Sequence, residues 1–428
     1  MFKTLRNAWS IPELRKKLIF TVLILLIYRI GSAVPVPFVN FDAMSQYFDA
    51  SLSDTILGLY NAMSGSAFSQ ASVLALGIQP YINASIIIQL LTVAIPALER
   101  MAKEQGEIGK KKIERITRYT TIAIGLLLGF AYYTMINNAD YNILLTTGLP
   151  NILEAIVIIL SFAAGACLVM WLGEQINEHG IGNGISVILF ANIVAGFPSM
   201  VSYLTNSSMF QWWVAVIIAV VAILLIVFIV YVNDAERRIP IQYAKRVVGR
   251  KVYGGQSTNL PIKVAMSGVM PVIFAQSIVS VPATFWTFFG WNTESWGYKN
   301  IVSSTGWIYV AIYALLIFFF SWFYSTIQYD PTEISNNLKK NGGFIPGFRP
   351  GKPTADFIKK VIGKILIFGA VYLTIVALLP MIGNIIVPEM KYLAIGGTSV
   401  IIVVGVALET VKALEAQMMM RHYKGFLD

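Results

Sequence analysis

Apolar residues come in long runs along this chain, and ten of these runs are long enough to cross a membrane. A spanning helix needs about 20 mainly apolar residues. Lipid offers the backbone N–H and C=O groups no partner, so each run is expected to be helical. The predicted spans are residues 18–37, 75–97, 116–137, 151–173, 183–203, 212–232, 264–290, 306–327, 362–380 and 393–412.

The charged residues between the runs predict an orientation. Nearly all of the 32 Lys and Arg residues lie in the N-terminal arm, in three alternate connections and in the C-terminal tail. The positive-inside rule places these segments, and both termini, on the cytoplasmic side. The basic arm before the first run also fits a cleaved signal peptide, but the length of that run and the spans that follow favour a retained first span.

Ten spans with both ends on one side can form two sets of five in opposite orientations, as in inverted-repeat transporters. The sequence shows no internal identity, so topology alone supports this repeat. The predicted fold is an all-α polytopic membrane protein with two pseudo-symmetric halves, residues 1–205 and 206–428. The second half carries two long cytoplasmic loops, at about 233–263 and 329–361.

Composition supports a membrane protein and excludes several kinds of site. Hydrophobic residues make up 56% of the 428 and charged residues 13%, about half the charged share of a soluble protein. One cysteine and two histidines argue against a disulfide and against a histidine–thiolate metal site. We predict no cofactor and no catalytic residues, because the chain has no Walker motif and no nucleophile–base arrangement.

Charged side chains are rare within the spans. No span carries the carboxylate or histidine relay expected of an ion-coupled transporter. Arg29, near the outer end of the first span, is the exception. We expect its side chain to reach the interface or to cap backbone carbonyls.

One segment is too polar to face lipid. Asp54 to Val73, "DTILGLYNAMSGSAFSQASV", is amphipathic and rich in Gly and Ser, and it directly precedes the second span. Such a segment is tolerated at membrane depth only inside protein or beside a water-filled cavity. An exposed outer loop fits the pattern equally well.

Aliphatic pairs recur at similar depth in several spans. Ile78 and Ile82 are four residues apart and share a helix face, with Asn83 and Gln89 on a neighbouring face. Similar positions are Ile185, Leu189, Ile273 and Ile402. Ordinary helix packing explains these residues, and an aliphatic constriction that excludes water is the functional alternative.

Glycine and proline mark turns and breaks in the spans. "GIGNGIS", Gly180 to Ser186, predicts a tight turn between two spans, and Pro80, Pro271 and Pro282 are expected to interrupt theirs.

The two long basic loops exceed what is needed to join helices. They carry Lys245, Arg246 and Arg250 in the first, and Lys339, Lys340 and Arg349 in the second. Attraction to anionic lipid, at about 1 kcal/mol per residue, explains the charge but not the length. A docking surface for an acidic partner or a nucleic acid explains both. The loops lack an aromatic stacking series, so any RNA contact would be to phosphates only.

Six motifs occur in the order typical of one family. They are "YRIGSAVPVP" (28–37), "LGIQPYINASIIIQLL" (76–91), "WLGEQINEHGIGNGIS" (171–186), "QYAKR" (242–246), "PTEISNNLKKNGGFIPGFRPGKPT" (331–354) and "GGTSVIIVVGVALET" (396–410). Over essentially its whole length, the chain resembles the SecY family of protein-conducting channels.

The resemblance implies an hourglass-shaped channel, not an enzyme, in the bacterial cytoplasmic membrane. It would move unfolded secretory polypeptides across the membrane and release transmembrane segments sideways into lipid. SecA, an ATPase, or the translating ribosome would drive transport. Signal sequences and nascent or preprotein chains would be its substrates. SecE would clamp the two halves and SecG would lie at the periphery.

The resemblance also assigns residues. The pore ring would be Ile78, Ile82, Ile185, Leu189, Ile273 and Ile402, and leucine at 189 stands where the family often has isoleucine. The plug, within residues 54–73, would include Asn61, Met63, Ser64, Gly65, Phe68 and Ser72. The lateral gate, between the second and seventh spans, would include Asn83, Gln89, Gln276 and Val281. The docking residues for SecA or the ribosome would be Lys245, Arg246, Arg250, Lys339, Lys340 and Arg349.

Two other classes compete with the channel. A secondary transporter for a small solute would use the same helices, but it requires a midplane site and ion coupling, and the spans lack the carboxylates for coupling. An intramembrane enzyme or insertase scaffold would need a catalytic set, which the sequence does not show.

Overall fold

Helices make up most of the chain. The computed structural model describes residues 2–52, 56–103, 106–139, 141–145, 150–206, 212–243, 246–248, 251–253, 257–266, 268–288, 295–303, 306–386 and 391–424. The α-helices are α1 (Phe2–Ser10), α2 (Pro12–Ser32), α3 (Phe41–Tyr47), α4 (Ile56–Ser64), α5 (Gln79–Ala94), α6 (Pro96–Lys103), α7 (Gly106–Asn137), α8 (Asn151–His179), α9 (Gly184–Asn206), α10 (Trp212–Asp234), α11 (Met270–Phe288), α12 (Trp307–Gln328), α13 (Pro331–Lys340), α14 (Lys352–Ile386) and α15 (Lys391–Lys424), and short π-helical turns are η1 (Phe48–Leu52) and η2 (Tyr298–Val302).

A helix lies over each of the ten predicted spans. By length and hydropathy alone, four helical stretches of the described chain can each cross a membrane: Gly106–Asn137, Asn151–His179, Tyr298–Lys340 and Lys352–Leu379. The bent pair α5–α6 would make a fifth. The protein therefore has several membrane-crossing helices, and the count of ten stays a prediction.

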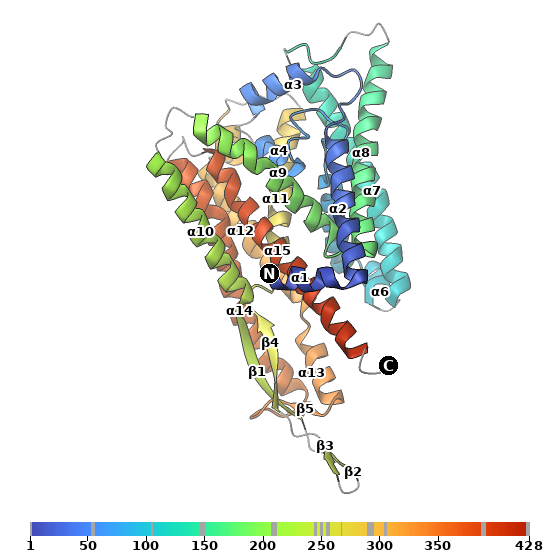
Figure 1. Ribbon diagram of the computed structural model, residues 1–428, viewed down its shortest axis with the longest axis vertical. Helices are drawn as coiled ribbons and strands as arrows, with labels where there is room; N and C mark the ends of the chain where they lie inside the picture. The colour runs from blue at the N-terminus through green and yellow to red at the C-terminus, as the bar shows by residue number, and fades with distance from the viewer. Residues whose placement is uncertain are drawn as a thin grey trace.

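The long helices form one packed body with early and late segments on opposite sides (Figure 1). On one side, α7 packs against α5 and α8, and on the other, α14 packs against α12 and α15. Contacts of α11 with α5 and α7, and of α15 with α9, join the two sides. The largest apolar cluster draws residues from both sides, so the helices share one core.

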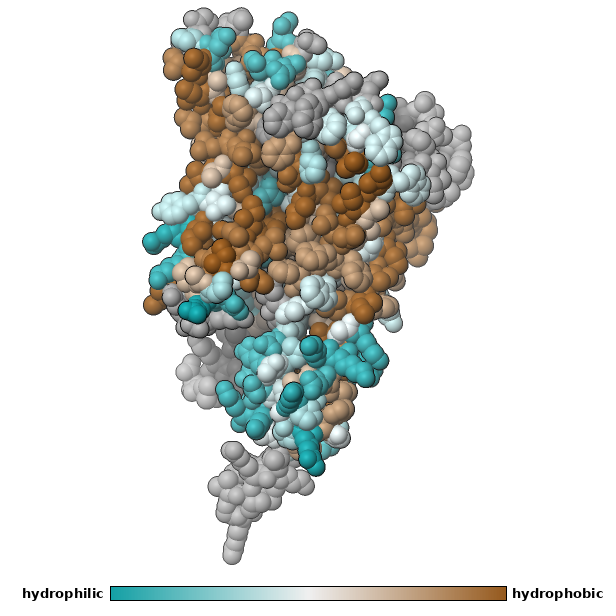
Figure 2. Space-filling model, turned by 180° about the vertical axis from the view of Figure 1, so that it is seen from behind, coloured by the Kyte–Doolittle hydropathy of each residue, from teal (hydrophilic) through white to brown (hydrophobic). Residues whose placement is uncertain are grey.

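A broad apolar surface surrounds the helical body. Figure 2 shows a mainly brown region between hydrophilic ends. Exposed apolar side chains contribute to this surface, among them Leu224 and Val227 of α10 and Leu315 of α12. An apolar surface of this extent is unfavourable in water, so the described helices belong to a multi-pass membrane protein.

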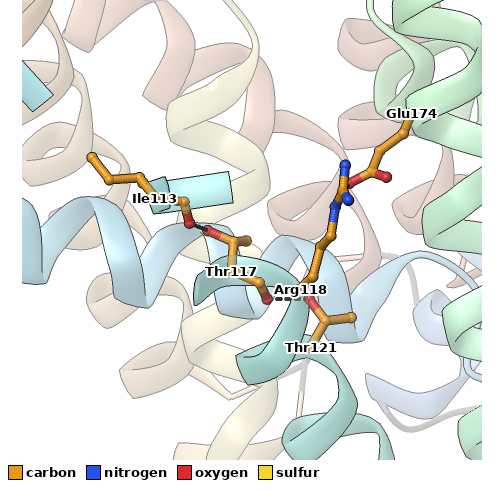
Figure 3. Close-up of polar contacts among 5 residues, drawn as sticks. All are labelled: Ile113, Thr117, Arg118, Thr121 and Glu174. Carbon is orange, nitrogen blue, oxygen red and sulfur yellow. Dashed lines mark hydrogen bonds and ion pairs between the residues drawn. The ribbon is translucent and has the colours of Figure 1, made fainter. Parts of the chain in front are cut away.

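An ion pair ties α7 to α8 (Figure 3). Arg118 Nε donates to Glu174 Oε1 at 2.8 Å. The hydroxyls of Thr117 and Thr121, in the same part of α7, donate to carbonyls one turn back in their own helix. These two hydroxyl groups are thus satisfied within α7 itself.

The breaks in the helices follow proline and glycine only in part. α5 and α6 meet at an angle of 105°, with Pro96 opening α6. Pro80 and Pro271 do not interrupt spans as expected, because they lie in the first turns of α5 and α11, where no backbone N–H is required. Pro282 lies inside α11. The predicted turn within 180–186 is confirmed, since α8 ends at His179 and α9 begins at Gly184.

The two long loops contain β-structure, so the all-α prediction is wrong there. The strands are β1 (Glu236–Tyr243), β2 (Arg246–Val248), β3 (Lys251–Tyr253), β4 (Ser257–Lys263) and β5 (Gly343–Phe344). They form an antiparallel sheet of order β4-β1-β5 and a separate β2-β3 hairpin. In β1, Ile239 and Ile241 are buried and Tyr243 packs against the same core, a short period-two signal that charged neighbours obscure.

The sheet and the segments beside it form a unit that we call the sheet extension: β1, β4, β5, α13 and the first turns of α14. It projects from one end of the helical body, and both termini lie near its junction with that body (Figure 1). Its apolar core joins the two loops, with buried residues Ile239, Ile241, Ile262, Met266, Leu338, Ile345, Ile358 and Ile362. The loops that look separate in sequence therefore fold together.

Candidate functional site

The predicted pore-ring residues converge inside the helical body. All six lie in or against the largest apolar cluster. Ile78, at the start of α5, and Ile82, Leu189, Ile273 and Ile402 are buried, and Ile185 is partly buried. They come from four helices, and between them they offer no hydrogen-bonding side-chain atom. The core at these positions is therefore apolar, and it draws side chains from both sides of the bundle.

The polar segment before α5 lies inside the protein, so the exposed-loop alternative is wrong. It consists of α4 followed by tight turns, and residues 53–55 are outside the described range. Met63, Ser64, Phe68 and Ser72 are buried, and Asn61 and Gly65 are partly buried. Met63 belongs to the same apolar cluster as the ring residues. The segment therefore packs against the same apolar cluster.

The turns after α4 are held by their own polar side chains. Asn61 Oδ1 accepts the Ser69 N–H at 2.9 Å, and Ser64 Oγ accepts the Phe68 N–H at 3.1 Å. The Phe68 ring packs edge-on against Tyr132 of α7, with centroids 4.7 Å apart. The Gly and Ser content that looked like a loop in the sequence instead builds a compact turn.

Polar groups from three other helices reach this segment. Arg29 Nη1 of α2 donates to the Gly65 carbonyl at 3.1 Å. Asn192 Nδ2 of α9 donates to the Met63 carbonyl at 2.8 Å. Gln79 Nε2 of α5 donates to Met63 Sδ at 3.2 Å. The expectation that Arg29 caps a carbonyl is confirmed.

Position 65 requires glycine. Its φ of +67° is unfavourable for residues with a side chain. A Cβ at this position would lie 2.4 Å from Arg29 Nη1 and 2.9 Å from Asn192 Oδ1. Both the backbone conformation and the close approach of these side chains therefore require glycine.

A groove separates α5 from α11. Its volume is about 230 Å³, and it is lined by residues of α5, α7 and α11 and by Tyr60 of α4. Of the predicted gate residues, Asn83 and Val281 line it from opposite sides. Gln276 is buried and Gln89 is exposed, and neither lines the groove. The structure thus brings together two of the four predicted gate residues.

The predicted docking residues lie on the sheet extension or on the hairpin beyond it. Lys339 and Lys340 are exposed in the last turn of α13, and Arg349 is exposed between β5 and α14. Thr354 Oγ1 donates to the Arg349 carbonyl at 2.8 Å, which holds the backbone there. Arg246 begins β2, and Lys245 and Arg250 lie outside the described residues.

The sequence did not lead us to predict a role for Asn192, and it holds two carboxylates within the spans that we did not consider. Asn192 follows Leu189 by three residues and Ile185 by seven, so it shares their helix face, and an amide on the pore face of an apolar span was a usable signal. Glu154 and Glu409 also fall within predicted spans, and Glu154 is buried in the first turn of α8.

Among the described residues, no group of three or more His, Cys, Asp and Glu could hold a metal ion.

The fold and site define a class: a multi-pass helical membrane protein with an apolar core shared by the two sides of the bundle and a short segment packed against that core. Comparison with known proteins agrees. The SecY family model matches residues 72–411. Protein translocase subunit SecY of Streptomyces galbus is 42% identical, and that of Thermotoga maritima 43%, each alignment covering the whole of this chain and 98% or more of the relative. This chain belongs to the SecY family.

Solved structures show the same fold. A protein-conducting channel aligns with a TM-score of 0.64 at 17% identity, covering 97% of each chain. A SecY structure whose plug domain is described as stabilising the closed state aligns with a TM-score of 0.61 at 18% identity, again over 97% of each chain. Sec61 in a canine ribosome–channel complex gives a TM-score of 0.60 at 16% identity and the same coverage. Membership of the SecY family supports the protein-conducting channel and not the secondary transporter for a small solute.

Proposed function

We propose that this chain is the pore-forming subunit of a protein translocase in the bacterial cytoplasmic membrane. It moves unfolded polypeptides across the membrane and lets apolar segments leave sideways into lipid. The observation that carries the proposal is the meeting of six aliphatic side chains from four helices with Met63 of the adjoining segment in one buried cluster.

The six ring residues form the seal. An aliphatic constriction offers water and ions no hydrogen bond, so it blocks them by dewetting. The same side chains can part around a polypeptide of any sequence because they make no specific contact. The segment from α4 to Ser72 acts as a plug that covers the seal from the outer side. The protein supplies a path, and a partner supplies the energy.

The groove between α5 and α11 acts as the lateral gate. A signal sequence is an apolar helix, and each Leu, Ile, Phe or Val at its centre favours lipid by about 0.3–0.6 kcal/mol. Polar contacts between helices in membranes contribute on the order of 0.6 kcal/mol each. A few apolar residues can therefore open a seam whose lining includes Asn83, Ser277 and Ser280. Gln89 and Gln276, which do not line the groove, belong to the same gate in this proposal.

The exposed basic residues of the sheet extension, together with the basic residues predicted in its hairpin, bind the motor. Their charge suits an acidic surface of SecA or the phosphates of ribosomal RNA, and a ribosome-bound Sec61 channel has this fold. SecE holds the two five-helix halves, 1–205 and 206–428, from outside, and SecG lies at the edge. With ten spans, both termini and the sheet extension lie in the cytoplasm, in keeping with their positive charge.

A transport assay tests the proposal. The chain is reconstituted with SecE and SecG into vesicles, and SecA, ATP and a signal-bearing polypeptide are added. We expect part of the polypeptide to become protected from external protease, and protection to require both ATP and the signal. Protection that needs neither, or none at all in vesicles that hold folded protein, would refute the proposed function.

A further inference from the structure

The polar contact between α9 and the plug is unusual for its place in the protein. Asn192 is fully buried on the helix face that also carries Leu189 and Ile185. A buried amide inside a membrane protein is costly unless its groups are paired. Its presence beside an aliphatic seal therefore requires a reason other than packing.

Asn192 joins two elements that must separate if the plug moves. Its Nδ2 donates to the Met63 carbonyl at 2.8 Å and to the Tyr28 hydroxyl at 2.9 Å. An amide NH₂ has two hydrogens, so both are used. A carbonyl can only accept, so the nitrogen of the amide must face Met63. One side chain of α9 thus links the plug to α2.

The other contacts concentrate on the same three plug residues. Arg29, next to Tyr28 in α2, donates to the Gly65 carbonyl at 3.1 Å. The Oδ1 of Asn192 has no hydrogen-bond partner in the described part of the chain, and it lies where a side chain at Gly65 would clash. Residues 63–65 therefore lie against donors from α2 and α9 with no space for a side chain at Gly65.

We infer that Asn192 is a latch for the plug: its donation to the Met63 carbonyl holds the plug closed and so sets how strong a signal must be to open the channel. This inference rests on the proposed function and deepens it by assigning the regulation of the same site. When the plug leaves, the Met63 carbonyl loses its partner and the Asn192 amide loses one of its two partners, in a region with little water. That loss is the barrier which an arriving signal must overcome.

The resting ion permeability of vesicles tests the latch without any substrate. Asn192→Leu keeps the size of the side chain and removes both donations. We expect its resting permeability to exceed that of the wild type at least about fivefold, the effect of one lost hydrogen bond together with an unpaired carbonyl. Asn192→Ala, which also lacks the donors, should change it in the same direction. Tyr28→Phe, which leaves the Met63 contact intact, should raise it less.

Thr121→Val is the matched control, because it also removes a buried polar group but from a bond within α7. Permeability of Asn192→Leu and Asn192→Ala equal to that of Thr121→Val, in equally folded protein, would overturn the latch. A larger effect of Tyr28→Phe than of Asn192→Leu would overturn it too, since the α2 contact would then carry the closure.

Transport of a polypeptide with a weakened signal gives the second readout. We expect the Asn192→Leu channel to accept such a signal several-fold better than the wild type. Equal rejection by both channels, with strong signals transported by both, would refute the latch and leave the proposed function standing. Failure of the wild type to transport any signal-bearing polypeptide would refute the proposed function, while the permeability ratio still decides the latch.

Discussion

At the scale of single residues, the proposed seal needs only aliphatic side chains at the centre of the bundle. The ring positions are aliphatic, and all but Ile185 are buried, while Asn192 and Gln79 donate hydrogen bonds to Met63 of the proposed plug. Ile78, Ile82, Ile185 and Leu189 could be predicted as a helix face from their spacing alone. Their convergence could not, because four helices that are distant in sequence must pack before the ring exists.

Replacing Ile82 and Ile273 by Asn should open the resting channel to ions. Two amides in the constriction supply hydrogen bonds to water, and hydration removes the dewetting barrier. We expect a raised resting conductance in planar bilayers, with signals of reduced strength also accepted. Leu91→Asn, an exposed position on the same helix as Ile82, should leave the conductance at the wild-type level. Conductance that stays low in the double variant would remove the ring assignment.

Reversing the charge at Arg349 should weaken docking of the motor. Its side chain is exposed on a segment whose backbone is fixed by Thr354, so Arg349→Glu should alter the surface without unfolding it. We expect SecA-driven transport to fall about tenfold or more, since like charges that face each other across an interface cost several kcal/mol, while the protein still inserts into the membrane. Lys110→Glu, the reversal of an exposed charge on α7 outside the sheet extension, is the control. Transport at the wild-type rate by Arg349→Glu would contradict the docking role.

At the level of elements, the sequence predicted the helices far better than the strands. Long apolar runs mark membrane helices directly, and a helix lies over each of them. The strands β1, β4 and β5 need partners from two loops, and Gln242 pairs with both Ser257 and Phe344. A short alternating stretch among charges does not reveal such distant pairing. The burial of α4 was likewise undecided in the sequence, because it depends on packing against α9 and α15.

Truncating a buried side chain in the core of the sheet extension should lower the stability of that unit. Ile358 of α14 is fully buried against the sheet, and a buried Ile→Ala change costs about 2–5 kcal/mol. We expect Ile358→Ala to speed amide exchange in β1, β4 and α13 while α7 and α8 keep their protection. Asn336→Ala, on the exposed face of α13, is the control. Unchanged exchange in β1 would show that the two loops are not one folded unit.

At the level of the whole molecule, the apolar belt, the apolar core and the basic extension fit the proposed path for a polypeptide. The belt suits lipid, the extension presents charge at one end, and the proposed plug packs against the core that both sides of the bundle share. Sequence motifs were enough to predict the family, because six occur in order along the chain. The hydrogen bonds that would hold the plug closed could be identified only in the folded structure, because they join the plug to α2, α5 and α9.

The path itself is best tested by locating a polypeptide in transit. A photo-crosslinking amino acid replaces Ile273, and a signal-bearing chain is stalled during transport. The account predicts a strong crosslink to the stalled chain at position 273, which disappears when the chain is released. The same probe at Ile312, an exposed position on α12, should give none. Equal crosslinking at both positions, or none at 273 while transport proceeds, would contradict the claim that polypeptides pass through this ring.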